Sequence, residues 1–189
     1  SPKTTSPKKV SSPVAKLEKK LAELKDRLEK LKAGEKKKPA KAAAKKAPSL
    51  PKKTDLSKWC SPIEDQGQLG SCTAHAGIGL YEYFERRAFG KHTDASRLFL
   101  YKTTRNLLKW KADDGAYLRT TMAAMALFGL VPERFCPYEE DKFNEEPTPF
   151  MYSYAQNFQA LLYYRLDADG VRGKLLLDKI KEHLANGLP

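Results

Sequence analysis

The stretch "EDQGQLGSCTAHAG", from Glu64 to Gly77, decides the fold of this chain. It contains three glycines and one cysteine, Cys72, at the point where a helical pattern begins. A cysteine on the first turn of a helix meets unpaired backbone N–H groups and the positive end of the helix dipole, which favour the thiolate. Because the thiolate is the nucleophilic form, this position predicts a reactive Cys72.

The residues ahead of Cys72 suit an attack on an amide carbonyl. Gly67 and Gly70 allow a tight turn and let a substrate backbone come close. The attack creates an oxyanion, which needs hydrogen-bond donors aimed at it. We expect the Gln66 side-chain amide and the backbone N–H of Cys72 to supply two of these donors.

Charge divides the chain into two parts. The first 58 residues carry 19 Lys and Arg against 6 Asp and Glu, whereas the rest of the chain carries 16 against 17. The first part has no aromatic residue before Trp59 and is rich in Lys, Ala, Pro and Ser, so it lacks the apolar surface for a core. We predict a disordered or helical basic extension over 1–49 and a packed domain over 50–189.

A heptad pattern inside the extension predicts a helix over about 13–33. The apolar positions of the pattern are Val14, Leu17, Leu21, Leu24, Leu28 and Leu31. The flanking pairs Lys20/Lys25 and Arg27/Lys32 would repel each other in a parallel homodimer, so a partner helix should be acidic or antiparallel. A lone, marginal helix is the alternative.

Residues 35–53 form a linker rich in Lys, Ala and Pro. Lysines within 1–53 can contact nucleic-acid phosphates without reading sequence. The alternative is a solubilising tether, which we favour because no aromatic residue is present to stack on bases.

Cysteine count and hydropathy bound the class of protein. Three cysteines do not form a disulfide framework, which favours a reducing compartment such as the cytoplasm, and Cys60 and Cys136 are expected to be buried apolar residues. No apolar run approaches the ~18–20 residues of a membrane span. Cys72 and His75 offer at most two metal ligands, so we expect neither a metal nor a cofactor.

Helix signals recur through the domain, at about 71–89, 94–110, 117–128 and 174–185. Ser71 and Asp94 are the expected N-caps of the first two helices. The aromatic and aliphatic run over 158–166 predicts a β-strand.

The segment "DQGQLGSCTA" resembles the active-site segment of papain-like (cathepsin-type, C1) cysteine peptidases. It matches that family at Gln66, Gly67, Gly70, Ser71 and Cys72, and it departs from it at Leu69 and Thr73. The resemblance implies a Cys72 nucleophile with Gln66 at the oxyanion, and it places Gly70, Ser71 and Gly115 beside the substrate. Leu69 replaces a cysteine that forms a disulfide in secreted members, so the pattern fits the bacterial-type, disulfide-poor branch.

The resemblance also implies an α+β papain-like fold, of which 50–189 would be the mostly helical N-terminal lobe. A papain-like enzyme needs a histidine and an asparagine ~130–150 residues after the cysteine, which is beyond Pro189. His183 comes too early, and His75 and His92 are not expected to act as the base. We therefore expect the second lobe to lie outside this sequence and the 189 residues alone not to hydrolyse peptides.

Two functions follow from these patterns. The first is a cysteine endopeptidase that acts on peptides or proteins. The second is a catalytically inactive, peptidase-like adaptor that its basic coiled-coil region tethers to a protein partner or to nucleic acid.

Overall fold

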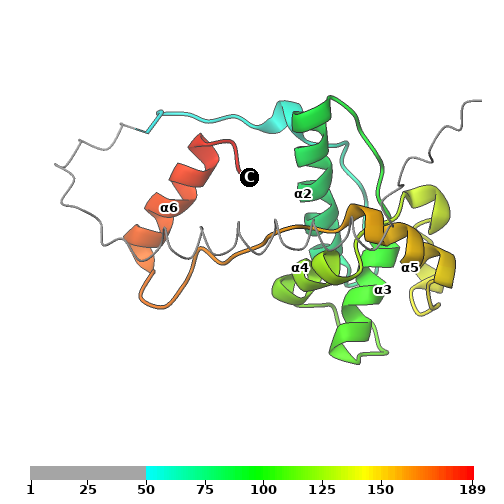
Figure 1. Ribbon diagram of the computed structural model, residues 1–189. Helices are drawn as coiled ribbons and strands as arrows, with labels where there is room; N and C mark the ends of the chain where they lie inside the picture. Colours follow the sequence, from blue (N-terminus) through cyan, green and yellow to red (C-terminus); the bar gives the residue numbers. More distant parts are fainter. Residues whose placement is uncertain (1–49) are drawn as a thin grey trace, which may run out of the picture. The chain divides into compact units, whose positions relative to one another are not determined.

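The computed structural model describes residues 50–189. The predicted heptad helix over 13–33 and most of the linker lie outside the described residues. The α-helices of the described part are α2 (Cys72–Phe89), α3 (Arg97–Leu108), α4 (Leu118–Leu127), α5 (Pro149–Ala155) and α6 (Gly173–Ala185) (Figure 1). Short 3-10 helices are η1 (Ser57–Trp59), η2 (Glu133–Phe135), η3 (Glu140–Lys142) and η4 (Gln156–Phe158).

β-structure within residues 50–189 is limited to one isolated antiparallel bridge between Ala95 and Pro132. The described part is therefore helical, as expected for the helical lobe. The β component of the predicted α+β class is not seen in these residues. None of their helices is both long and apolar enough to cross a membrane.

The core lies where α2, α3 and α4 pack against one another. Its buried side chains are Ala74, Ile78, Ala95, Leu100, Tyr101, Ala124, Met125 and Leu130. Gly77 lies on the face of α2 that meets the other two helices, and a Cβ there would come within 3.1 Å of Leu100 Cδ2 and Met125 Sδ. The missing side chain lets the helices approach closely and so fixes α2, whose first residue is Cys72.

The predicted limits of α2, α4 and α6 are confirmed to within a few residues. α2 ends at Gly90, whose φ of 65° is the left-handed conformation that glycine adopts easily. The predicted cap of α3 is wrong, because Ser96 Oγ accepts the hydrogen bond from Phe99 N at 3.0 Å. Asp94 instead binds Arg97 Nη1 at 3.0 Å.

Helix α5 is missing from the sequence prediction, although its start carries a signal. Thr148 is the N-cap and accepts a hydrogen bond from Met151 N at 3.3 Å, and Pro149 occupies the first helical position. The helix packs aromatic side chains against a second apolar cluster around Phe99 and Val131.

A buried ion pair connects α2 to the start of α3. Glu82 is fully buried, and its Oε2 lies 3.3 Å from Arg97 Nη2. Glu82 Oε1 also accepts a hydrogen bond from Ala95 N at 3.2 Å. Buried charges are costly unless they are paired and hydrogen-bonded, so these contacts specify how α2 and α3 meet.

The predicted strand over 158–166 is wrong. Phe158 ends η4, and Ala160 N donates to Met125 O at 3.1 Å, next to the end of α4. Beyond that contact the chain continues without helix or strand (Figure 1), and Leu161 and Leu162 are 99% and 79% exposed. The composition suits a strand, but no neighbouring strand within the described residues completes the hydrogen-bond ladder that a strand requires.

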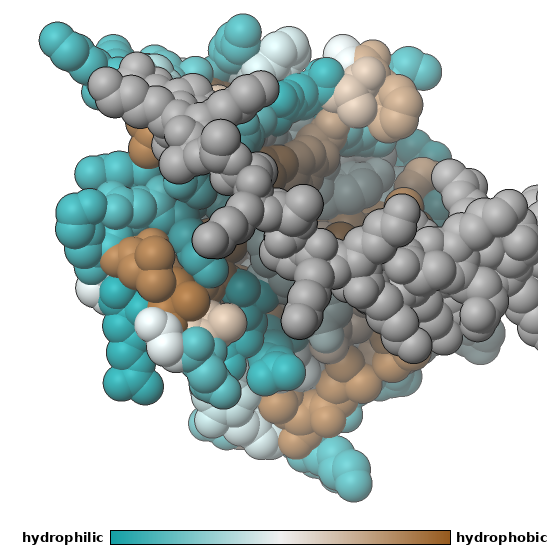
Figure 2. Space-filling view, turned by 60° about the vertical axis from the view of Figure 1, so that its left-hand side comes forward, coloured by the Kyte–Doolittle hydropathy of each residue, from teal (hydrophilic) through white to brown (hydrophobic). Residues whose placement is uncertain are grey.

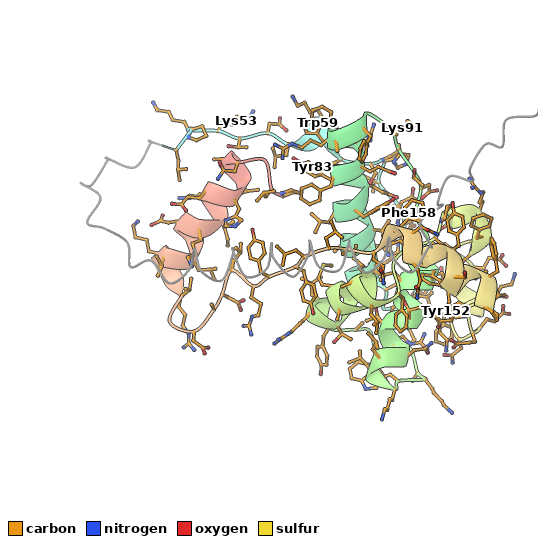
Figure 3. All side chains as sticks on the ribbon, viewed as in Figure 1. Lys53, Trp59, Tyr83, Lys91, Tyr152 and Phe158 are labelled. Atoms are coloured by element: carbon orange, nitrogen blue, oxygen red, sulfur yellow. The ribbon has the colours of Figure 1, made fainter. Side chains whose placement is uncertain are left out.

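Helix α6 has no buried residue, and contacts at its C-terminal end tie it to α2. Tyr83 on α2 donates to Gly187 O at 2.9 Å, and Arg87 Nη1 donates to the same carbonyl. Figure 3 shows Tyr83 projecting from α2 toward this end of the chain. Figure 2 turns the side that carries α6 forward and shows apolar patches between hydrophilic side chains. Exposed apolar residues of α6 are Leu175, Leu177, Ile180 and Leu184.

All three cysteines are free thiols. The prediction of a buried Cys60 is wrong, because this residue directly follows η1 in an exposed part of the chain. Cys136 is half-buried, and burial raises the pKa of its thiol.

Candidate active site

Cys72 is the first residue of α2, as the sequence predicts. The residue is exposed, whereas Ser71 directly before it is fully buried. The backbone N–H groups of a first helical turn point toward the N-terminal end of the helix. The sulfur is therefore accessible and lies beside this positive end.

Two carboxylates hold the loop that leads to Cys72. Asp65 Oδ1 accepts a hydrogen bond from Gly67 N at 2.9 Å, and Glu140 Oε2 accepts one from Gln68 N at 3.1 Å. Gly67 has a φ of 59°, and a Cβ there would overlap the Glu140 carboxylate. Glycine is thus needed at this position both for the turn and for the approach of Glu140.

Gly70 and Gly115, the predicted substrate-binding glycines, lie against each other. A Cβ on Gly70 would come within 3.0 Å of both Cα and N of Gly115. Gly70 N donates to the two Asp113 carboxylate oxygens at 3.0 and 3.1 Å, and the Tyr101 hydroxyl donates to the same carboxylate. Burial and this carboxylate raise the pKa of Tyr101.

Asp113 is a site residue that the sequence analysis missed. Its bond to Gly70 joins residues 43 positions apart, and no local pattern indicates such a contact. Its place two residues before Gly115 is the nearest signal, because that glycine has a φ of 80° and so marks a turn.

Gln66 is half-buried, and its amide helps to hold the loop. Nε2 donates to Leu69 O at 2.8 Å, and the Gln66 carbonyl accepts a hydrogen bond from the Tyr138 hydroxyl at 2.8 Å. An amide nitrogen carries two hydrogens, so the bond to Leu69 leaves one to donate elsewhere. The oxyanion role of Gln66 stays a prediction.

Ser71 occupies the N-cap position of α2, but its side chain makes no capping hydrogen bond. Its Oγ lies 2.6 Å from the Tyr138 hydroxyl and 3.2 Å from His75 Nδ1. The residue is fully buried and its hydroxyl is bonded within the loop, and its predicted place beside the substrate stays a prediction.

The described contacts of the three histidines do not join them to Cys72. His75 Nδ1 lies 3.2 Å from Ser71 O, and burial lowers the pKa of this imidazole. His183 is bonded to Tyr164 and to the backbone of α6, and His92 is exposed after α2. These contacts reveal no base for the thiol.

This chain is similar to known proteins in sequence and in fold, although no family model matches it. An uncharacterized peptidase C1-like protein of Acanthamoeba polyphaga mimivirus is 32% identical over 128 residues, which is 66% of this chain and 41% of that protein. The crystal structure of xylellain, a cysteine protease from Xylella fastidiosa, superposes with a TM-score of 0.62 and 28% identity. That match covers 74% of this chain and 55% of xylellain.

This chain spans 41% of the length of the viral relative and 55% of the length of xylellain. Both are named as peptidases or proteases, and one match rests on sequence while the other rests on structure. The resemblance drawn from "DQGQLGSCTA" is confirmed, because this chain is similar in sequence to a peptidase C1-like protein and in structure to a cysteine protease.

Proposed function

We propose that this chain supplies the nucleophile of a cysteine endopeptidase. The Cys72 sulfur attacks the carbonyl carbon of a peptide bond and forms a tetrahedral intermediate, which expels the amine and leaves an acyl group on sulfur. Water then releases the acyl group as a carboxylate. The single observation that carries the proposal is an exposed Cys72 that begins α2 at the end of a rigidly held loop.

Gln66 and the Cys72 backbone take the oxyanion role in this proposal. One hydrogen of the Gln66 amide is bound to Leu69 O, which limits how the side chain can rotate. The second hydrogen and the Cys72 N–H would donate to the developing negative charge. A donor already held in place needs no reorganisation during the reaction, which is why such donors are effective.

In this proposal, Gly70 and Gly115 line the surface along which the substrate peptide binds. Their backbones approach closely and carry no side chains, so an extended peptide can lie along them. Asp113 supports this surface, because its carboxylate accepts the hydrogen bond from Gly70 N.

The proposal assigns the general base to none of the described residues. His75 is engaged by Ser71, and His183 is engaged by Tyr164. We infer that an imidazole from a further segment or a second polypeptide completes the site, and that the 189 residues alone do not turn over peptides.

The unassigned general base favours a second candidate function, that of a peptidase-like adaptor without catalysis. Such a protein would keep the fold and bind partners, and Cys72 would not react selectively. Partner contacts through the helix at 13–33 or through nucleic acid at 1–53 remain predictions. Retention on DNA that falls with salt and is lost on deletion of 1–53 would test the nucleic-acid contact.

A peptidyl vinyl sulfone separates the two candidates, because it modifies a thiol that binds peptide beside it. We expect labelling of Cys72 in preference to the exposed Cys60, read by mass spectrometry of digested full-length protein. In a protein or complex that also supplies the general base, Gln66→Ala should slow peptide hydrolysis about 100-fold or more, as loss of an oxyanion donor does in other enzymes. Gln68→Ala is the matched control in the same loop and should change the rate little. Equal labelling of Cys60 and Cys72 would favour the adaptor.

A further inference from the structure

Tyr138 joins two residues that frame the proposed nucleophile. Its hydroxyl lies 2.8 Å from Gln66 O and 2.6 Å from Ser71 Oγ. Gln66 carries the proposed oxyanion donor, and Ser71 directly precedes Cys72. One hydroxyl therefore contacts both the start and the end of the loop that presents the thiol.

The hydrogen bonds around this hydroxyl have a fixed direction. A backbone carbonyl can only accept, so the Tyr138 proton goes to Gln66 O, and Ser71 Oγ must donate to the Tyr138 oxygen. Ser71 O also can only accept, so His75 Nδ1, 3.2 Å away, carries a proton and donates. Ser71 Oγ, whose own proton goes to Tyr138, also lies 3.2 Å from His75 Nδ1 and can accept from it, so the donors run from His75 through the Ser71 hydroxyl and Tyr138 to Gln66.

Tyr138 is held from two further sides. Its backbone N–H donates to Glu133 Oε1, and its ring meets the His75 ring edge-on with centroids 5.2 Å apart and an interplanar angle of 82°. Burial raises the pKa of Tyr138, so its hydroxyl keeps the proton that the chain requires. A side chain fixed in this way transmits position to the loop instead of adapting to it.

We propose that Tyr138 is a positioning residue of the site. Through its hydroxyl it fixes Ser71 and the Gln66 backbone, and thereby the directions in which the Cys72 thiol and the Gln66 amide face a substrate. Tyr138 itself contacts no reacting atom. The inference deepens the proposed function and rests on it, but its geometric content can be tested on the thiol alone.

Tyr138→Phe removes the hydroxyl and keeps the ring. The test measures the rate at which iodoacetamide alkylates Cys72 in the full chain as a function of pH, with Cys60 as the internal standard. We expect alkylation of Cys72 to slow about three- to tenfold at neutral pH, because Ser71 and the first turn of α2 no longer hold the thiol in one orientation. The Cys60 rate should stay the same.

Tyr152→Phe is the matched control. Tyr152 is also half-buried, and its hydroxyl donates to a carboxylate, Glu146, at 2.6 Å. It takes no part in the chain from His75 to Gln66, so its loss should leave the Cys72 profile unchanged. If Tyr152→Phe slowed Cys72 as much as Tyr138→Phe does, the effect would be a general loss of stability and the proposal would be overturned.

Ser71→Ala removes another hydroxyl from the same run of hydrogen bonds. It replaces Tyr138→Phe as the test variant if Tyr138→Phe is thermally less stable than the wild type. The double variant should be no slower than the slower single variant, because both remove one connected unit. Wild-type profiles in both single variants would overturn the proposal. Alkylation needs neither a peptide nor a general base, so a missing peptidase activity would defeat the proposed function and leave this inference standing.

Discussion

Helices α2 and α3, near the proposed active site, bury many of their side chains. The chain after residue 158 leaves most of its side chains exposed. In α2 and α3 even charged side chains are covered, as the pair of Glu82 and Arg97 shows. In the C-terminal part even leucines are exposed, and α6 has no buried residue. The first region is held by its own contacts, whereas the second is tied to it at a few points.

This difference shows where the site obtains its rigidity. The loop before Cys72 is bonded to η3 through Glu140 and to Tyr138, and α2 is buried from Ala74 to Tyr83 along one face. None of these contacts involves α6. The geometry at Cys72 should therefore survive changes in the C-terminal part that would be damaging if they were made in α2 or α3.

The largest effect is expected where the buried pair is broken. Glu82→Ala removes the buried partner of the Arg97 guanidinium and leaves it only the exposed Asp94 carboxylate as a charged partner, so the free energy of unfolding should fall by about 3 kcal/mol, the low end of the cost of breaking a buried pair. The matched change is Asp178→Ala in α6, which removes the exposed pair between Lys174 Nζ and Asp178 Oδ2 at 2.6 Å. That change should cost less than about 0.5 kcal/mol. Urea denaturation measures both, and equal losses would show that the two regions do not differ.

A smaller effect follows from Glu133 in η2. Burial raises the pKa of Glu133 to about 7 from its ordinary value of 4.5. Between these values the folded protein holds a proton that the unfolded chain has lost, so stability is greatest below the unfolded pKa and falls as the pH rises toward 7. Because the side chain is partly exposed, we expect a loss of about 1–2 kcal/mol across this window.

Glu133→Gln tests that expectation, because the amide cannot ionise and can still accept from Tyr138 N. Urea denaturation at about pH 5 and about pH 7.5 should show a smaller pH dependence in the variant than in the wild type. An unchanged pH dependence would assign the effect to other groups.

The smallest effect concerns the attachment of α6. Tyr83→Phe removes the hydrogen bond to Gly187 O, which should cost about 1 kcal/mol. Amide hydrogen exchange should become about fivefold faster in α6 and stay the same in α3, because local opening follows local stability. Faster exchange in both helices would show that α6 is part of the same cooperative unit as the core.

The sequence predicted the elements whose signals are local. The glycines after α2 and α4 and the leucine spacing of α6 mark these helices, and "DQGQLGSCTA" identified Cys72 and its loop. The sequence predicts Asp94 as the N-cap of α3, whereas the structure uses Ser96. Asp and Ser are similarly good caps, so the packing of the chain and not the local sequence decides between them. The prediction of a strand at 158–166 is wrong because a strand needs a neighbouring strand, which a local sequence pattern does not specify.

The parts of the site that could not be predicted are the contacts between distant segments. Asp113 reaches Gly70 across 43 residues, and Tyr138 reaches Gln66 across 72. Both contacts arise because the segments after α3 and η2 fold back against the loop before α2. No periodicity or composition in the sequence encodes such a meeting point.

The most direct test of the central claim is a crystal structure of the full chain with a peptide aldehyde. We predict a hemithioacetal on Cys72 whose oxygen lies within about 3.2 Å of both Gln66 Nε2 and the Cys72 backbone nitrogen. An aldehyde bound to Cys60, or an oxygen on Cys72 that points away from Gln66, would contradict the account.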